Sequence, residues 1–388
     1  MTSLRTPSLI TVLDTILVAT IVALAVALAV FVASCTESQP APTTAKVKST
    51  GSQQTPAQAQ PKSAEPGPAT AMPSSAELES QPAMPLPTLA VLKVALLSPG
   101  PVSDAGWNAL AYEGLLAIRD ELGAEVSQVE TKTPAEFEEG FRDYARRGYA
   151  LVFGHGFEFQ EAAAAVAADF PQTTFITTSG NTVRKNVAPL RFMLEEATYL
   201  AGMMAGQMSD SGIAGAVGGM AIPSVESTLL AFEAGARSVN PDFRVIRSYI
   251  GSWDDVGAAK EAANAQIQQG ADFLIHNADA AGLGVFQAAQ ANHILAFGTN
   301  KNQNDIAPDT VLASAVINVP RAFVEVARQV KTRTFKAKIV KLGMADGIVT
   351  FEINPALASR IPASVNARVE ATRKLIIAGK VRVPSAEF

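Results

Sequence analysis

The chain has 388 residues, of which 17% are charged, and a formal net charge of −5 with a pI near 5.4. This acidic balance, with no dense basic run beyond "KTRTFKAK" near residue 331, disfavours a nucleic-acid-binding surface and favours a small ligand. Its single cysteine, Cys35, excludes an internal disulfide.

The N-terminal segment 1–34 has the pattern of a lipoprotein signal peptide. Arg5 precedes an uncharged stretch, 16–34, that closes on "VASC". Two small residues directly before Cys35 suit a peptidase that cleaves there and leaves a thiol to carry diacylglycerol. The alternative is a retained transmembrane anchor, because 19 residues nearly span a hydrocarbon core of about 30 Å.

Residues 35–90 are expected to form a lipidated cysteine followed by a disordered tether. Proline makes up 10 of the 55 residues in 36–90, and that stretch contains no aromatic residue. Such a composition cannot bury a hydrophobic core. The tether would hold the remainder of the chain away from a membrane.

Residues 91–388 are long enough for two lobes, and their pattern predicts an α/β fold. Lobe 1, about 91–209, contains four β-rich runs separated by helical segments. Lobe 2, about 210–310, repeats this alternation. The strand runs are, in chain order, "KVALLSPG", "AEVSQVET", "YALVFGHG", "TTFITTSGN", "GIAGAVGG", "FRVIRSYI", "ADFLIHNA" and "HILAFGTN". The pattern predicts parallel sheets covered by helices on both faces.

The final part, 311–388, is expected to supply hinge crossings and closing elements. "VLASAVIN" and "KIVKLGMADGIVTFEIN" have the pattern of returning strands, and 362–378 that of a closing helix. Two lobes with similar strand, turn, helix and strand units suggest a cleft between the carboxyl ends of their strands. The predicted architecture is a hinged, two-lobed solute-binding protein.

Four blocks of this sequence are similar to signature blocks of the basic membrane protein family, and they occur in the family's order. They are "SDAGWNALAYEGL", "EEATYLAGMMAG", "AGAVGGMAIPSV" and "FEAGARSVNPDF". The family comprises purine-nucleoside-receptor-type substrate-binding lipoproteins of ABC transporters. The resemblance covers about residues 92–380 and implies the type I periplasmic-binding-protein fold.

The first strand-to-helix turn carries an acid, an indole and an amide: Asp104, Trp107 and Asn108. The resemblance implies that Asp104 and Asn108 face the hydrogen-bonding edge of a purine, with Trp107 near the base. A carboxylate accepts from N–H groups, an amide both donates and accepts, and an indole offers a flat face. Alternatively, Ser103 or Asp104 caps the helix and Trp107 fills a seam within the lobe.

Further candidates stand at other strand ends. Phe157 and Trp253 could stack on a ligand, although Phe157 could instead belong to the core. Thr178 and Ser179 could bond a ligand or cap a turn, and the sequence does not separate these roles. Asp279 is a candidate polar partner. Asp255, beside Trp253, is expected to cap a helix.

Two positions depart from the family pattern. Asn300 stands where many members have an aspartate that holds the ribose hydroxyls, and Ile317 stands where they have a lysine that reaches the sugar. An amide oxygen is a weaker acceptor than a carboxylate, and isoleucine donates nothing. We therefore expect a free nucleobase, or another flat heterocycle, to bind at least as well as a nucleoside.

Enzyme activity is not expected. His155, His276 and His293 lack metal-ligand spacing, although the first two fall at strand ends, and the chain has no phosphate-loop or Gly-X-Ser-X-Gly pattern. We expect no cofactor and no metal. The expected partners are a small purine-like ligand, ABC permease subunits and, through the lipid, a membrane, with the chain itself a monomer. A tethered sensor of the same fold is the alternative.

Overall fold

The computed structural model describes residues 91–104 and 106–388, which belong to one compact unit, Met84–Phe388. The predicted signal peptide, Cys35 and nearly all of the tether lie outside the described residues. The elements are β1 (Lys93–Ser98), α2 (Trp107–Leu122), β2 (Glu125–Glu130), α3 (Pro134–Arg146), β3 (Leu151–Gly154), η1 (Phe157–Phe159), α4 (Gln160–Ala167), β4 (Thr174–Thr178), β5 (Val187–Phe192), α5 (Glu195–Met208), β6 (Ile213–Gly218), α6 (Pro223–Arg237), β7 (Arg244–Tyr249), α7 (Val256–Gln268), β8 (Phe273–Asn277), η2 (Asp279–Ala281), α8 (Gly282–Ala291), β9 (Leu295–Asn300), β10 (Val311–Ile317), α9 (Val319–Lys331), β11 (Val340–Leu342), β12 (Val349–Ile353), η3 (Ala358–Arg360) and α10 (Ala363–Ile377).

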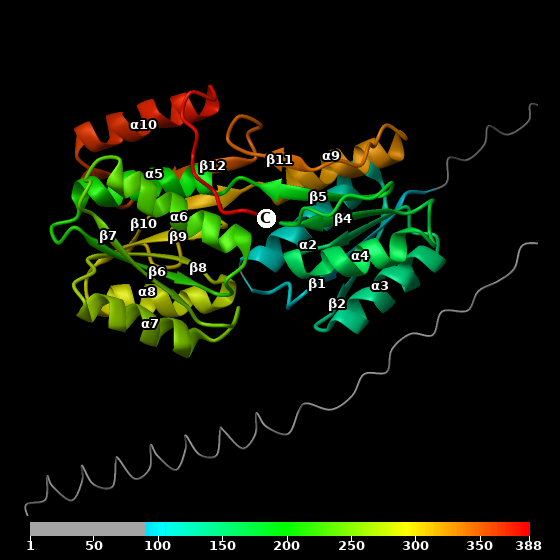
Figure 1. Ribbon diagram of the computed structural model, residues 1–388, viewed down its shortest axis with the longest axis horizontal. Coiled ribbons are helices and arrows are strands. Elements are labelled where there is room, and N and C mark those ends of the chain that lie inside the picture. The colour runs from blue at the N-terminus through cyan, green and yellow to red at the C-terminus, as the bar shows by residue number, and fades with distance from the viewer. Residues whose placement is uncertain (1–90, 105) are drawn as a thin grey trace, which may run out of the picture. The chain divides into compact units, whose positions relative to one another are not determined.

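Two six-stranded sheets organise these elements (Figure 1). The first has the order β11-β5-β4-β3-β1-β2 and the second the order β12-β10-β9-β8-β6-β7. All neighbouring strands within them are parallel except β10 and β12. The alternation predicted from the sequence is therefore confirmed, including the returning strands β10 to β12 and the closing helix α10.

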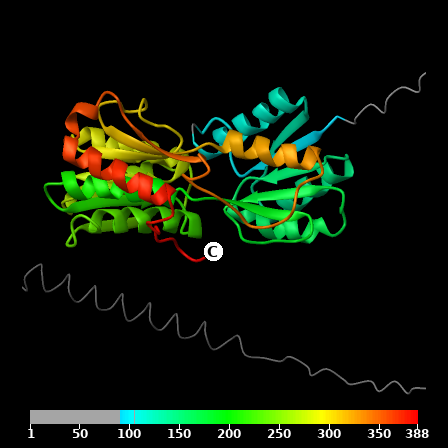
Figure 2. The same ribbon diagram turned by 90° about the horizontal axis from the view of Figure 1, so that it is seen from above.

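Helices cover both faces of each sheet (Figures 1 and 2). On the first sheet α2 packs beside α9 on one face, and α3 packs beside α4 on the other. Apolar residues recur along α2 at helical spacing, at Ala111, Leu115, Ile118 and Leu122, and all four are buried. This helix is therefore stabilised by the removal of one of its faces from water. The second sheet is covered by α5 and α6 on one face and by α7 and α8 on the other.

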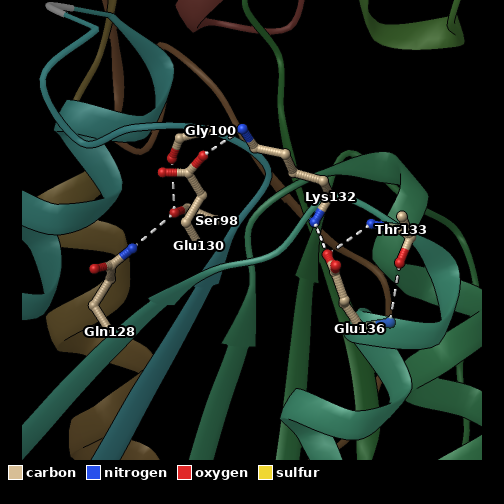
Figure 3. A network of polar contacts seen from close by, with 7 residues as sticks. All are labelled: Ser98, Gly100, Gln128, Glu130, Lys132, Thr133 and Glu136. Carbon is tan, nitrogen blue, oxygen red and sulfur yellow. Dashed lines mark hydrogen bonds and ion pairs between the residues drawn. The ribbon is translucent and has the colours of Figure 1, made fainter.

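Short polar networks fix the turns at the carboxyl ends of β1 and β2 (Figure 3). The Ser98 hydroxyl donates to the Gly100 carbonyl at 2.9 Å and accepts from the Gln128 amide at 3.0 Å. At the start of α3, Thr133 and Glu136 form a capping box that satisfies backbone N–H groups the helix leaves free. The turn that leads from β1 toward α2 is thereby anchored at its first residue.

The chain passes between the two sheets in three places, after β5, after β10 and after β11. Backbone hydrogen bonds join these crossings to one another: Met193 N–H donates to the Leu342 carbonyl, and Asn318 N–H donates to the Ile348 carbonyl at 2.7 Å. The Glu196 carboxylate accepts from Met344 N–H at 2.6 Å. Three chain crossings joined by hydrogen bonds are typical of a hinge between two lobes.

Helices α5 and α6 cross with unusually little space between them. A Cβ atom added at Gly202 would overlap the Phe232 carbonyl, and one added at Gly235 would overlap the Tyr199 carbonyl. The Thr198 hydroxyl then reaches across and donates to the Thr228 carbonyl at 2.9 Å. This crossing fixes the position of α6, whose first turns face the other lobe.

Candidate functional site

A cavity of about 570 Å³, including the solvent at its mouth, lies between the carboxyl ends of the two sets of strands. Both lobes contribute to its wall. The lining residues are Pro99, Trp107, Gly156, Phe157, Glu158, Ser179, Phe192 and Leu194 from the first lobe, and Ile222, Ser224, Val225, Thr228, Trp253, Asn277, Asp279, Asn300 and Ile317 from the second.

Six of the nine residues singled out from the sequence line this cavity, and so does Ile317. The six are Trp107, Phe157, Ser179, Trp253, Asp279 and Asn300. Asp104, Asn108 and Thr178 are not among its lining residues. All nine nevertheless lie at or just beyond strand ends, as the parallel-sheet argument required.

Asp104 holds the start of α2. Its carboxylate accepts from the N–H groups of Gly106, Asn108 and Ala109 at 2.8–3.0 Å, and also from the Asn108 side-chain amide at 2.9 Å. These are the free donors of a helix N-terminus, and a carboxylate there also interacts favourably with the helix dipole. The capping alternative therefore describes its observed contacts, while ligand contact by Asp104 and Asn108 stays a prediction.

Trp107 combines the two roles considered for it. Its ring stacks on His155 with centroids 4.0 Å apart and meets Phe192 edge-on at 6.0 Å. It also lines the cavity, where Phe157 and Trp253 supply further aromatic surface. Aromatic groups from both lobes thus offer flat apolar faces to a ligand.

His155 is fully buried behind Trp107. Its Nε2 donates to the Trp107 carbonyl at 2.9 Å, which leaves Nδ1 to accept from the Thr178 hydroxyl at 3.4 Å. Burial lowers the pKa of His155 to about 3, so the ring is neutral near pH 7. His155 and Thr178 therefore support the aromatic wall from behind.

His276 is buried in the second lobe in a similar way. Its Nε2 donates to the Gln303 side-chain carbonyl at 3.0 Å, and burial lowers its pKa to about 4. His293 is exposed. None of the three histidines lines the cavity, and within residues 91–104 and 106–388 no group of three or more His, Cys, Asp or Glu side chains is placed to hold a metal ion.

Three cavity residues adopt the left-handed backbone conformation that favours glycine: Ser179, Asp279 and Asn300, with φ of 66°, 46° and 67°. They account for three of the five non-glycine residues with positive φ in the described part of the chain. Backbone strain of this kind gathers at functional sites, where the surrounding structure enforces it.

A chain of hydrogen bonds orders the polar side chains of the second lobe. The Asn277 amide donates to the Thr228 hydroxyl at 2.9 Å. The Asn300 amide donates to Asn277 Oδ1 and to Asp279 Oδ1, each at 3.3 Å. This chain orients the Asn300 side chain, because its amide nitrogen is turned toward its two neighbours.

Two carboxylates, Glu158 and Asp279, line the cavity from opposite lobes. Burial raises the pKa of Asp279 well above its ordinary value, and the negative charges of Asp104 and Glu158 raise it further. Desolvation also raises the pKa of Glu158, although this residue is exposed. The two carboxyl groups at this end of the site therefore favour their protonated forms more than isolated carboxyl groups do.

Sequence reasoning missed several lining residues, above all Glu158, Asn277 and Thr228. Asn277 ends β8, and Glu158 stands next to Phe157, so the strand-end rule pointed to their neighbourhood but not to them. Thr228 lies one and a half turns into α6. Only the tight crossing of α5 and α6 brings it to the cavity.

Within residues 91–104 and 106–388, no helix combines the length and the apolar character needed to cross a membrane.

Residues 91–387 match the Bmp family, described as "ABC transporter substrate-binding protein PnrA-like". Three relatives are a purine-binding protein of Brucella abortus (31% identical, 75% of this chain and 82% of the relative), an ABC transporter nucleoside-binding protein of Lactococcus lactis (27%, 76% and 89%) and the transcriptional activator protein med of Bacillus subtilis (30%, 63% and 76%).

Two solved structures share the fold. A solute-binding protein of an ABC transporter system from Aeropyrum pernix superposes with a TM-score of 0.69 at 23% identity, over 76% of this chain and 94% of that one. Another, from Conexibacter woesei, gives 0.62 at 26% identity, over 76% and 100%. These likenesses confirm the periplasmic-binding-protein type of fold expected from the sequence.

The family consists of binding proteins rather than enzymes, in agreement with a cavity built for recognition. A hinge of three crossings, aromatic walls from both lobes and ordered polar side chains form the ligand-capturing apparatus of that fold. The chain belongs to the Bmp family of PnrA-like substrate-binding proteins of ABC transporters.

Proposed function

We infer that this protein captures a purine nucleobase or nucleoside between its lobes and delivers it to the permease of an ABC importer. The observation that carries this proposal is the cavity between the lobes, where aromatic rings from both sides accompany polar side chains. A flat heterocycle fits such walls, and its edge groups need hydrogen-bonding partners. Relatives named for purine and nucleoside binding support the same ligand class.

We expect a free base to bind at least as tightly as its nucleoside. Asn300 and Ile317 both line the cavity, and they stand where relatives of this kind are expected to have charged partners for the sugar. Among the described lining residues, no lysine or arginine takes over that role. A base therefore keeps the aromatic contacts, while ribose would gain few strong hydrogen bonds.

Ligand binding should stabilise the protein by mass action. A base present at a hundredfold excess over its Kd is expected to add about 2.7 kcal/mol to the free energy of unfolding. Differential scanning fluorimetry with purine bases, nucleosides and related heterocycles measures this as a rise in Tm. If no member of the panel shifts Tm, the proposed ligand class is wrong.

The same assay tests the aromatic wall. Trp253→Ala should weaken base binding by about fivefold or more, because base–aromatic stacking contributes about 1–3 kcal/mol. Leu375→Ala, which truncates an exposed apolar residue of α10, is the matched control and should bind like the wild type. Equal affinities of wild type and Trp253→Ala would remove Trp253 from the site.

We also propose that the protein is lipid-anchored on the extracytoplasmic face and acts as a monomer. Cys35 lies outside the described residues, so this rests on the pattern of segment 1–34. Cys35→Ser should abolish labelling with radioactive fatty acid. The double variant Cys35→Ser with Ser38→Cys should stay unlabelled, because the new thiol no longer follows the small residues. Persistent labelling of Cys35→Ser would exclude this anchor.

A ligand sensor is the second candidate function. The relative named transcriptional activator protein med has 30% identity over 63% of this chain, so members of similar sequence serve regulation as well as transport. Deleting the gene separates the two functions. Loss of uptake of radioactive base supports transport, whereas unchanged uptake with altered transcription supports sensing.

A further inference from the structure

Two acids and no basic side chain are found among the described residues that line the cavity. The acids are Glu158 and Asp279. None of the ion pairs in the described part of the chain involves either acid. Lys301, next to Asn300 in the sequence, is instead held by Glu113 at 2.7 Å.

Two further polar atoms, Asn300 Oδ1 and the Ser179 hydroxyl oxygen, have no hydrogen-bond partner among the described residues. The Asn300 side chain is 6% exposed, and because its nitrogen is occupied by Asn277 and Asp279, its carbonyl oxygen is left for the cavity. The Ser179 hydroxyl, 8% exposed, bonds to no other described residue. A buried polar group that lacks a protein partner needs one from a ligand or from water.

Without a ligand that donates hydrogen bonds, these acids favour their protonated forms, because burial and neighbouring charges raise the pKa of Asp279 and desolvation raises the pKa of Glu158. Asp104 is committed to the helix start by four hydrogen bonds, so its negative charge stays near Asp279. Glu158 and Asp279 line one cavity, where the negative charge of either acid disfavours ionisation of the other. A ligand that donates hydrogen bonds offsets this repulsion, whereas an anion adds to it.

We propose, building on the purine-binding function above, that the Glu158–Asp279 pair selects amino-substituted purines and rejects anionic ones. Each acid accepts from an N–H group on its own side of the heterocycle, and the Asn300 carbonyl accepts from a further one. The ligand class is thus a donor-rich, uncharged purine such as adenine or 2,6-diaminopurine. Urate, an anion at neutral pH, is excluded.

Three purines that differ only in amino groups test this selection: unsubstituted purine, adenine and 2,6-diaminopurine. Calorimetric titration of the wild type should show affinity rising about tenfold or more with each amino group, as expected for hydrogen bonds to a charged acceptor. Urate should show no binding. Equal affinities across the series, or urate binding as tightly as adenine, would overturn the proposal.

Two isosteric variants then assign the effect to the acids. Glu158→Gln and Asp279→Asn each remove an ionisable carboxyl group with little change of shape, and asparagine tolerates the left-handed backbone at 279. In each variant, the gain in affinity with each amino group should be about tenfold smaller than in the wild type. Unsubstituted purine should still bind. Glu161→Gln, an exposed acid on α4, is the matched control and should keep the wild-type series. An unchanged series in both cavity variants would refute the role of the pair.

A proton count provides a readout that a purely structural role would not change. The groups facing Asp279 are Asp104, Glu158 and the Asn300 amide. Hydrogen bonds donated by a ligand favour the ionised acids, so adenine binding should release protons, and less so in Asp279→Asn. Titrations in two buffers of different ionisation heat measure this release. Proton uptake, or no change in bound protons, would contradict the proposal.

If no purine binds the wild type at all, the purine-binding function itself fails, which is a distinct outcome.

Discussion

Gly202→Ala is expected to destabilise the protein by about 3 kcal/mol, although alanine is the better helix former. The reason is the crossing of α5 and α6, where an added Cβ would overlap the Phe232 carbonyl. Backbone atoms cannot rotate away as a flexible side chain can, so the two helices must separate. Urea unfolding followed by circular dichroism measures the loss.

The matched control is the same substitution in an uncrowded helix. Gly257 lies in the first turn of α7, and the only atom within 4 Å of an added Cβ there is a carboxylate oxygen of Asp255. Gly257→Ala should therefore be neutral or stabilising by up to about 1 kcal/mol. Equal effects of the two substitutions would mean that the helix crossing does not depend on Gly202.

The crossing also connects a sequence block to the site. Gly202 and Gly206 belong to "EEATYLAGMMAG", and both lie against α6. The position of α6 places Thr228, whose hydroxyl holds Asn277, which in turn holds Asn300. We therefore expect Gly202→Ala to weaken ligand binding as well, although Gly202 does not line the cavity.

The fold was largely predictable because its determinants are local and repeated. Apolar runs bounded by turn residues predicted the parallel strands, and the buried stripe of α2 followed helical spacing. Asp255 caps α7 as expected, with its carboxylate accepting from Ala258 N–H at 2.9 Å. These features depend on residues within one or two turns of each other, which a single sequence contains.

The site was predictable only in position. The strand-end rule pointed to Ser179, Asp279 and Asn300, because parallel strands bring their carboxyl ends to one edge. It could not decide whether Asp104 serves a helix or a ligand, since both uses need the same acceptor. Nor could it show that Glu158 lines the cavity together with Phe157, because that depends on the conformation of the short helix η1.

The second large effect concerns acid stability and the two buried histidines. The pKa values of His155 and His276 are lowered to about 3 and about 4 by burial, against about 6.5 in an unfolded chain. Between these values the unfolded state binds more protons, so stability is fully present above pH 6.5 and falls as the pH drops toward 4. Each histidine should contribute about 1.4 kcal/mol per pH unit to this loss.

Glu195 acts in the opposite direction. Burial raises its pKa to about 7, so the folded state holds a proton that the unfolded state releases above its own lower pKa. This group therefore adds stability as the pH falls from about 7 to 4.5. The slope of the wild type is a balance of these groups, and only a comparison of variants separates them.

Urea unfolding at several pH values between 6.5 and 4.5 makes that comparison. His155→Gln should reduce the dependence of the unfolding free energy on pH by about 1.4 kcal/mol per unit, whatever its constant loss of packing against Trp107. Leu375→Ala, which truncates an exposed apolar residue of α10, is the control and should leave the slope unchanged. An unaltered slope in His155→Gln would mean that His155 does not stay neutral in the folded protein. A reduced slope would show that protonation of His155 destabilises the folded protein. The His155 ring stacks on Trp107 and donates to its carbonyl, so this loss would affect the aromatic wall of the cavity.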